Sequence, residues 1–271
     1  MSDTRRLIFD IGFNNGDDTF HYLGQGYDVV AVEANPVLAE AGRKRFADAI
    51  AAGRLHLLGV GIAEQSGQAD FYVNELNDGW SSFLPDAGMR GGRFSVISVP
   101  TITIADLFAR FGTPYYLKID IEGHDWFCIR DMPATPPYVS IEAHRLEYLA
   151  VLYVKGYRQF KVVNQADHFP NSWSGPVSDT YSEWDTLETV AYDWLHVRLG
   201  RLERSSLGNG WFDFHAKLGG DELSGGQAKK PFRFRRTRLH YTNARFRLRT
   251  AIARTRLGRA IKSFIRRKKT T

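Results

Sequence analysis

The sequence predicts an α/β fold in which helices cover both faces of a mostly parallel sheet. Short apolar runs alternate with helical segments from the N-terminus onward. The close spacing of these elements favours parallel strands that are buried on both faces. Glycine or acidic residues directly follow several of the runs, at the strand ends where open α/β sheets bind ligands.

The expected elements follow in the order β-α-β-α-β and then continue. We expect strands at 6–11, 27–32 and 54–60, and helices at 17–23 and from Pro36 to about Ala51, since Asn35 and Pro36 are typical of a helix start. Farther along, we expect strands at 68–73, 115–120, 138–142, 157–163 and 211–217, and helices at 103–111 and 125–132. The stretch 164–210 indicates only mixed loops and helices.

Length and composition exclude several classes of protein. With 271 residues, 43% of them hydrophobic, the chain can bury a sizeable core and is not disordered throughout. Cys128 is the only cysteine, so neither an internal disulfide nor a thiolate metal site can form. No apolar run reaches the roughly 18 residues that span a bilayer, and the N-terminus lacks a secretory signal. We therefore expect a cytoplasmic protein.

Charge divides the chain into two parts. Before Lys229 there are 19 basic and 30 acidic residues, a net charge of −11, whereas the residues from Lys229 onward carry 17 basic and no acidic side chains. The glycine-rich stretch between the parts has the composition of a flexible connector. The sequence thus predicts a globular domain over 1–218, a linker over 219–231 and a basic tail over 232–271.

The first strand ends in a glycine loop that carries acidic residues. Gly12 and Gly16 allow a tight turn and a close approach to a nucleotide-like cofactor, and Asp17 and Asp18 follow. The loop is not the G-x-G-x-x-G pattern of a pyrophosphate binder, and its carboxylates disfavour a phosphate. An ordinary strand-to-helix turn is the alternative interpretation.

The second strand ends at Glu33, 21 positions after Gly12. An acidic side chain there can accept hydrogen bonds from both hydroxyls of a ribose. Together with the glycine loop it indicates an adenosine-containing cofactor without a pyrophosphate. S-adenosylmethionine fits, because it combines a ribose with a positive sulfonium.

Two later strands also end in charged residues. Lys118, Asp120 and Glu122 lie at the end of one, and Lys118 and Asp120 share a face because side chains alternate along a strand. A structural salt-bridge network is the alternative interpretation of this group. The next strand adds Glu142 and His144, and His144 is a candidate base.

These residues resemble the FkbM-type family of S-adenosylmethionine-dependent methyltransferases. The resemblance covers about residues 6–217 and rests on Phe9–Thr19, Val32–Pro36, Gly61–Ala63, Ser66–Gly67, Phe71–Val73 and Lys118–Gly123, with weaker agreement at Gly156–Tyr157 and Trp211–Ala216. It implies a Rossmann-like, seven-stranded class I methyltransferase sheet with helices on both faces. It also implies O-methylation of a hydroxyl on a sugar, glycan or natural product.

The resemblance also suggests roles for individual residues. Asp10, Gly12 and Gly16 are expected at the methionine end of the cofactor, Glu33 at the ribose, and Ile62 with Ala63 near the adenine. The full set of candidate cofactor-binding residues is Asp10, Gly12, Asn14, Gly16, Asp17, Glu33, Ala34, Ile62, Ala63 and Asp120.

Methyl transfer to an alcohol requires alignment of the hydroxyl and removal of its proton. We expect His144 to be the base and Asp120, Glu122 and Lys118 to assist. Asp120 and Glu122 could hold a divalent cation, but two carboxylates on one turn are too few to predict a metal. Trp80, Ser81 and Ser82 are candidate contacts for the acceptor.

The basic tail leaves alternatives open. Apolar residues at helical spacing within it are typical of an amphipathic helix on an anionic membrane surface, so we expect a peripheral protein on the inner face of the membrane. A disordered, solvated segment is the competing interpretation, and nucleic acid is a less favoured partner. An RNA methyltransferase is disfavoured because the acidic body repels phosphates. An NAD-dependent dehydrogenase is disfavoured because the chain lacks the G-x-G-x-x-G motif of that class. The sequence does not predict an oligomeric state.

Overall fold

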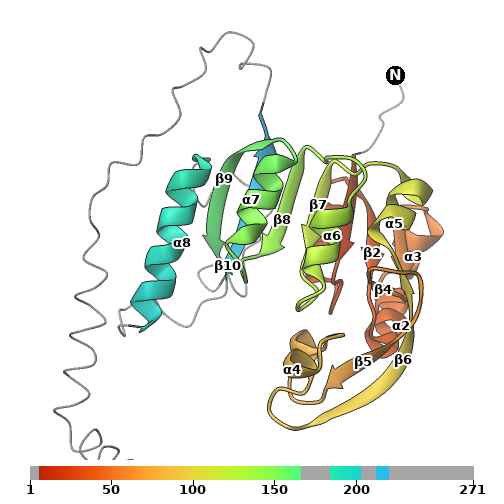
Figure 1. Ribbon diagram of the computed structural model, residues 1–271. Coiled ribbons are helices and arrows are strands. Elements are labelled where there is room, and N and C mark those ends of the chain that lie inside the picture. The colour runs from red at the N-terminus through yellow and green to blue at the C-terminus, as the bar shows by residue number, and fades with distance from the viewer. Residues whose placement is uncertain (1–5, 166–183, 203–211, 220–271) are drawn as a thin grey trace, which may run out of the picture. The chain divides into compact units, whose positions relative to one another are not determined.

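A seven-stranded sheet forms the centre of the computed structural model, which describes residues 6–165, 184–202 and 212–219 (Figure 1). Its strands are β1 (Leu7–Ile11), β2 (Asp28–Val32), β3 (Leu55–Leu58), β7 (Tyr116–Ile119), β8 (Tyr138–Glu142), β9 (Tyr157–Asn164) and β10 (Phe212–Leu218). Their order across the sheet is β3-β2-β1-β7-β8-β10-β9. Strands β1, β2, β3, β7 and β8 run parallel, whereas β10 is antiparallel to both of its neighbours. The seven-stranded, Rossmann-like sheet expected from the sequence is confirmed.

This order places several strand ends along one edge. The carboxyl ends of β1, β2, β7 and β8 lie together, and the amino end of the antiparallel β10 joins them, because Asp213 is the register partner of Glu142. Ligands of open α/β sheets bind at this kind of edge. The fold therefore brings the candidate residues of four separate sequence segments to one place.

Helices cover both faces of the sheet. They are α1 (Asp17–Gly24), α2 (Pro36–Arg45), α3 (Ala47–Ala51), α5 (Ile104–Phe111), α6 (Asp125–Asp131), α7 (Glu147–Val154) and α8 (Leu187–Leu202). Phe9 and Ile11 pack into a core with residues of α5, α6, α7 and α8, whereas their neighbour Ile8 packs on the opposite face with residues of α1. In Figure 1, α6 and α7 lie in front of the sheet. The alternation of side chains along a strand thus creates two cores.

A smaller sheet follows β3 in the chain. It contains β4 (Gly61–Ile62), β6 (Phe94–Ile102) and β5 (Gly67–Asn74) in that order. The connection from β5 to β6 carries a 3-10 turn (Asp78–Trp80) and the short helix α4 (Pro85–Gly88). The buried side chain of Asn74, at the end of β5, holds this connection against the small sheet. Its amide donates hydrogen bonds to the carbonyls of Gly88 and Arg90.

The structure differs from the expected elements in several places. The single helix expected from Pro36 to Ala51 is split, because Phe46 leaves helical geometry (φ −111°, ψ 25°) and is buried against the ring of Phe13. Strand β6 and helix α7 were not expected at all. The helix expected at 103–111 is confirmed, and it begins with a capping box in which Thr103 and Asp106 bond each other's backbone N–H.

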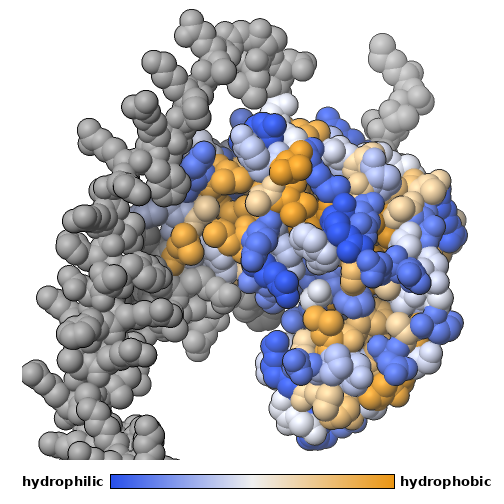
Figure 2. Space-filling view, viewed as in Figure 1, coloured by the Kyte–Doolittle hydropathy of each residue, from blue (hydrophilic) through white to orange (hydrophobic). Residues whose placement is uncertain are grey.

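The described surface shows exposed apolar side chains over α7 and α8 (Figure 2). By their exposed fraction, Tyr153 and Val154 on α7 and Leu195 on α8 are among the exposed large apolar residues. Among the described residues, no helix has the length and apolar character required to cross a membrane. The expected linker (219–231), apart from Gly219, and the expected tail (232–271) lie outside the described residues.

Candidate active site

The glycine loop after β1 is held tightly between two neighbouring strands. The backbone N–H groups of Gly12 and Phe13 donate to the carbonyl of Val32 at the end of β2. On the other side, a Cβ atom added to Gly12 would lie 1.8 Å from the carbonyl oxygen of Asp120, and Gly12 has a φ of +98°. Only glycine fits this position, because both the conformation and the close approach exclude a side chain.

Glu33 fixes the far end of the same loop. One carboxylate oxygen accepts the N–H of Asn14 at 2.7 Å, and the other accepts the N–H of Asn35 at 2.8 Å. Burial raises the pKa of Glu33 despite these two hydrogen bonds. Because a carboxylate offers about four acceptor sites, Glu33 keeps capacity for a ligand hydroxyl.

Lys118 lies beneath the loop as the centre of an ionic cluster. Its Nζ donates to the carbonyl of Gly12 at 3.0 Å and lies 3.3 Å from Asp10, 3.2 Å from Asp18 and 3.8 Å from Asp120. These carboxylates raise the pKa of Lys118 although burial opposes them. Asp10 has no exposed surface and also accepts the hydroxyl of Thr19. Both side chains therefore support the loop from below.

A row of buried polar side chains continues from this cluster across the sheet. Successive register partners form it: Asp10, Lys118, Ser140, His215 and Lys161. None of them is more than 9% exposed. The salt-bridge network that the sequence left as an alternative for Lys118 is present around Lys118 itself, where the ammonium group faces Asp10, Asp18 and Asp120.

The loop between β7 and α6 is rigidly positioned. The Asp125 carboxylate accepts the N–H groups of Ile121 and Gly123. The His124 ring stacks on Phe83, and its Nδ1 lies 3.0 Å from the carbonyl oxygen of Ile62. Since a carbonyl can only accept, we assign the proton to Nδ1. Glu122 adopts the left-handed conformation (φ 50°), and its carbonyl accepts the Ser82 hydroxyl.

Acidic side chains crowd the edge above β7 and β8. Loss of hydration first, and then the nearby Glu142 carboxylate, raise the pKa of Asp120 and of Glu122 to about 7. His144 Nε2 lies 2.8 Å from a Glu142 carboxylate oxygen, and that hydrogen bond raises the pKa of His144 to about 9. The carboxylate of Glu142 thus stabilises the protonated form of the His144 imidazole.

Three further residues belong to this edge and were not among the sequence candidates. Asp213 enters from β10 next to Glu142, Asp18 contacts Lys118, and Arg90 lies 3.9 Å from Glu122. Burial and the carboxylates of Asp120 and Glu142 raise the pKa of Asp213. Asp213 lies within the Trp211–Ala216 motif, so its position in that motif could have identified it as a candidate. No sequence signal pointed to Arg90.

Other candidates lie away from the edge or serve the fold. Asp17 faces outward and pairs with Arg45, and its side chain is 69% exposed. The Ile62 side chain is in the core, and its neighbour Ala63 donates its N–H to Ile102 in the small sheet. Ala34 remains half-buried between Glu33 and Asn35. Ser82 was expected to contact the acceptor, but its side chain is fully buried. Its hydroxyl instead supports the Glu122 loop by donating to the Glu122 carbonyl.

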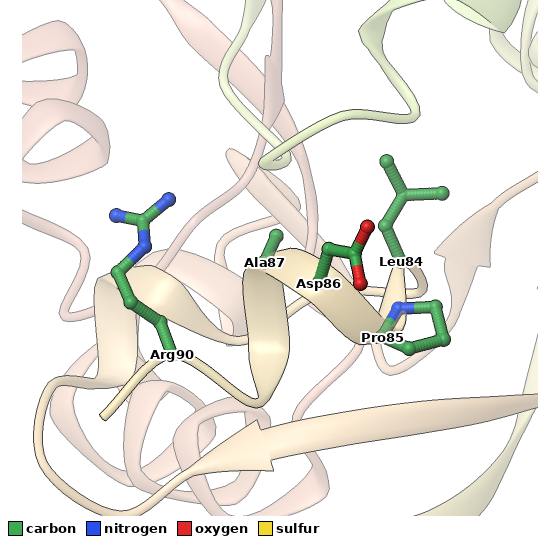
Figure 3. Close-up of a pocket in the computed structure, with 5 residues that line it drawn as sticks. All are labelled: Leu84, Pro85, Asp86, Ala87 and Arg90. Carbon is green, nitrogen blue, oxygen red and sulfur yellow. The ribbon is translucent and has the colours of Figure 1, made fainter. Parts of the chain in front are cut away.

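An open depression lies beside the edge on α4 (Figure 3). It is lined by Leu84, Pro85, Asp86, Ala87 and Arg90. Figure 3 shows Asp86, Ala87 and Arg90 on the same side of the helix. The Arg90 guanidinium also lies over the Trp80 ring at 5.1 Å, so this arginine links the depression, Trp80 and Glu122.

One protein family matches the chain over residues 10–171, the family of the methyltransferase FkbM domain. The matched segment includes the glycine loop, Glu33 and the β7 and β8 ends. No curated protein is similar to the chain in sequence.

Several solved methyltransferase structures are similar to the chain. Methyltransferase FkbM from Methylobacillus flagellatus has 18% sequence identity and a TM-score of 0.37, over 55% of this chain and 36% of that one. This chain therefore spans about a third of that protein's length. The C-terminal domain of precorrin-6Y C5,15-methyltransferase from Rhodobacter capsulatus has 11% identity and a TM-score of 0.39, over 79% of this chain and 80% of that one. A SAM-dependent O-methyltransferase from Thermotoga maritima has 10% identity and a TM-score of 0.35, over 80% and 61%.

Proposed function

Because the chain belongs to the methyltransferase FkbM family, we propose that it transfers a methyl group from S-adenosylmethionine to a hydroxyl of a sugar, glycan or natural product. The observation that carries this proposal is the single sheet edge that joins the glycine loop, Glu33 and a cluster of carboxylates. When bound, S-adenosylmethionine supplies a methyl group that its sulfonium has already activated.

The first part of the edge suits the cofactor. Gly12 brings the loop backbone against Asp120 without a side chain in between, and Glu33 holds the N–H groups of Asn14 and Asn35 while retaining acceptor capacity. We assign Glu33 to the ribose hydroxyls and the loop from Gly12 to Gly16 to the methionine end. Asp10 and Lys118 hold this loop from below.

The charge of the edge also suits this cofactor. Among the described residues, the carboxylates at this edge outnumber the basic side chains: Asp18, Glu33, Asp120, Glu122, Glu142 and Asp213 face Lys118, Arg90 and His144. A sulfonium and an ammonium group are attracted to such a site, whereas a pyrophosphate is repelled.

The second part of the edge suits the acceptor. Methyl transfer is an in-line displacement, so the chain must align the hydroxyl and allow its proton to leave. The sequence predicted His144 as the base, with Asp120, Glu122 and Lys118 assisting. Since His144 Nε2 lies 2.8 Å from a Glu142 carboxylate oxygen, we assign the acceptor hydroxyl to the two side chains together, with Glu122 beside them.

A labelled-methyl transfer assay tests the proposed function. The full chain is incubated with S-adenosylmethionine labelled in its methyl group and with panels of glycans, hydroxylated small molecules and RNA. We expect label on a hydroxyl oxygen of a glycan or small molecule, with one S-adenosylhomocysteine formed for each methyl transferred. Label on RNA alone, or on a nitrogen or carbon atom, would contradict the proposal.

A further inference from the structure

The turn after β8 folds His144 back onto Glu142. The His144 N–H donates to the carbonyl of Glu142 at 2.8 Å, two residues earlier. The side chains then meet as well, with His144 Nε2 2.8 Å from a Glu142 oxygen. A short local turn, fixed by the backbone, thus presents one imidazole and one carboxylate side by side.

A second carboxylate reaches the same point from the neighbouring loop. Ligand atoms of Glu122, Glu142 and His144 all lie within 4.8 Å of one another. The Glu122 loop is held in place by Ser82 and by the N–H bonds to Asp125. Three potential ligand atoms from two strand ends therefore converge on one rigid site.

Little positive charge is left to neutralise these carboxylates. Arg90 is 3.9 Å from Glu122, and its side chain is about half exposed. Lys118 already faces Asp10, Asp18 and Asp120. The carboxyl groups of Asp120 and Asp213 also lie near Glu122 and Glu142, and burial together with this crowding raises the pKa of Asp213. The positive groups that the structure places against Glu122 and Glu142 are therefore the half-exposed Arg90 and His144 itself, whose imidazole binds a cation once it has lost its proton.

We propose that Glu122, Glu142 and His144 bind one divalent cation of the first transition row, for which Mn²⁺ is the probe. In octahedral coordination, two adjacent ligands about 2.1 Å from such an ion lie roughly 3 Å apart, close to the 2.8 Å between Glu142 and His144. The third ligand atom, from Glu122, lies within 4.8 Å of the other two. An imidazole beside two carboxylates favours these ions over Mg²⁺ and Ca²⁺, which prefer oxygen ligands alone.

The role of the ion rests on the proposed function. Three protein ligands leave coordination positions open for the acceptor hydroxyl. A cation there acidifies the hydroxyl, and its proton is released to solvent. The oxygen then forms a bond to the methyl carbon as the carbon–sulfur bond breaks, and the electron pair of that bond stays on sulfur in S-adenosylhomocysteine.

The test measures Mn²⁺ binding by the untagged full chain, by calorimetry and by electron paramagnetic resonance. We expect one Mn²⁺ per chain with nitrogen hyperfine coupling from an imidazole. His144→Gln should abolish that coupling, and both His144→Gln and Glu142→Gln should weaken binding at least tenfold. The matched controls His56→Gln and Glu147→Gln remove an exposed imidazole and an exposed carboxylate elsewhere, so they should bind Mn²⁺ as the wild type does.

Two results would overturn the metal site. They are the absence of binding at millimolar Mn²⁺, and binding that His144→Gln and Glu142→Gln leave unchanged. Circular dichroism confirms that each variant is folded. S-adenosylmethionine affinity is measured in parallel without metal. If the wild type binds Mn²⁺ but not S-adenosylmethionine, the proposed function alone is refuted. If it binds S-adenosylmethionine but not Mn²⁺, the metal site alone is refuted.

Discussion

Gly12→Ala is the substitution for which the structure predicts the largest local effect. Its new Cβ would lie 1.8 Å from the Asp120 carbonyl oxygen, whereas real Cβ contacts are essentially never shorter than 3.0 Å. The loop or the end of β7 must therefore move by about 1.2 Å. A misplacement of about 1 Å in a catalytic site can reduce turnover ~100-fold. We expect a loss of that size, together with weaker S-adenosylmethionine binding.

Gly26→Ala is the matched control for this prediction. Gly26 has a similar φ of +89°, but nothing lies within 4 Å of the atom that would be added. Both variants should lose roughly 1–2 kcal/mol of unfolding free energy from the left-handed backbone. Only Gly12→Ala adds the steric overlap between the new Cβ and the Asp120 carbonyl oxygen. Urea unfolding, calorimetry and the labelled-methyl assay compare the two, and equal cofactor affinity and turnover in both variants would refute the reasoning.

Three further predictions concern other parts of the chain. His144→Ala should lower methyl transfer ~100-fold while cofactor affinity stays unchanged, because the side chain serves the acceptor; normal turnover would place that role elsewhere. Burial, aided by Lys161, lowers the pKa of His215 from its ordinary value of 6.5 to about 3. Between these two pH values the folded state therefore binds fewer protons than the unfolded state. This group's contribution to unfolding free energy should fall by about 2 kcal/mol from pH 7 to pH 5. His215→Leu should therefore flatten the pH profile of urea unfolding relative to the wild type, an expectation that parallel profiles would contradict, and His56→Leu is its control. Finally, a chain ending at Gln227 should no longer sediment with anionic liposomes, because residues 229–269 hold the 17 basic side chains expected to bind lipid; equal sedimentation of both chains would exclude that role.

The parallel part of the sheet could be predicted from the sequence because each of its strands is marked by a local pattern of residues. Buried strands such as β1, β2 and β8 read as short apolar runs that end in Gly12, Glu33 and Glu142. Parallel topology then brings these ends together without further information. The candidate residues at the edge were predicted from this combination of pattern and topology.

The parts that sequence reasoning missed depend on tertiary context. Strand β6 contains Pro100, which is normally excluded from a central strand. It is tolerated here because β4 pairs only with Thr101 and Ile102, so one side of Pro100 needs no ladder bond. Helix α7 is apolar without a clear period, which leaves helix and strand indistinguishable from the pattern. Asp213 reaches the edge only because β10 is inserted antiparallel between β8 and β9.

Binding of S-adenosylmethionine to the Glu33→Ala variant tests the central claim most directly. Glu33 holds Asn14 and Asn35 and is assigned to the ribose, so its loss should weaken binding by ~1–3 kcal/mol, the cost of unpaired buried polar groups. Glu40→Ala is the control, since that exposed carboxylate pairs with Arg43 and Lys44 on α2. Calorimetry on the full chain should show weaker binding in Glu33→Ala alone. Equal affinity in the wild type and Glu33→Ala would contradict the account.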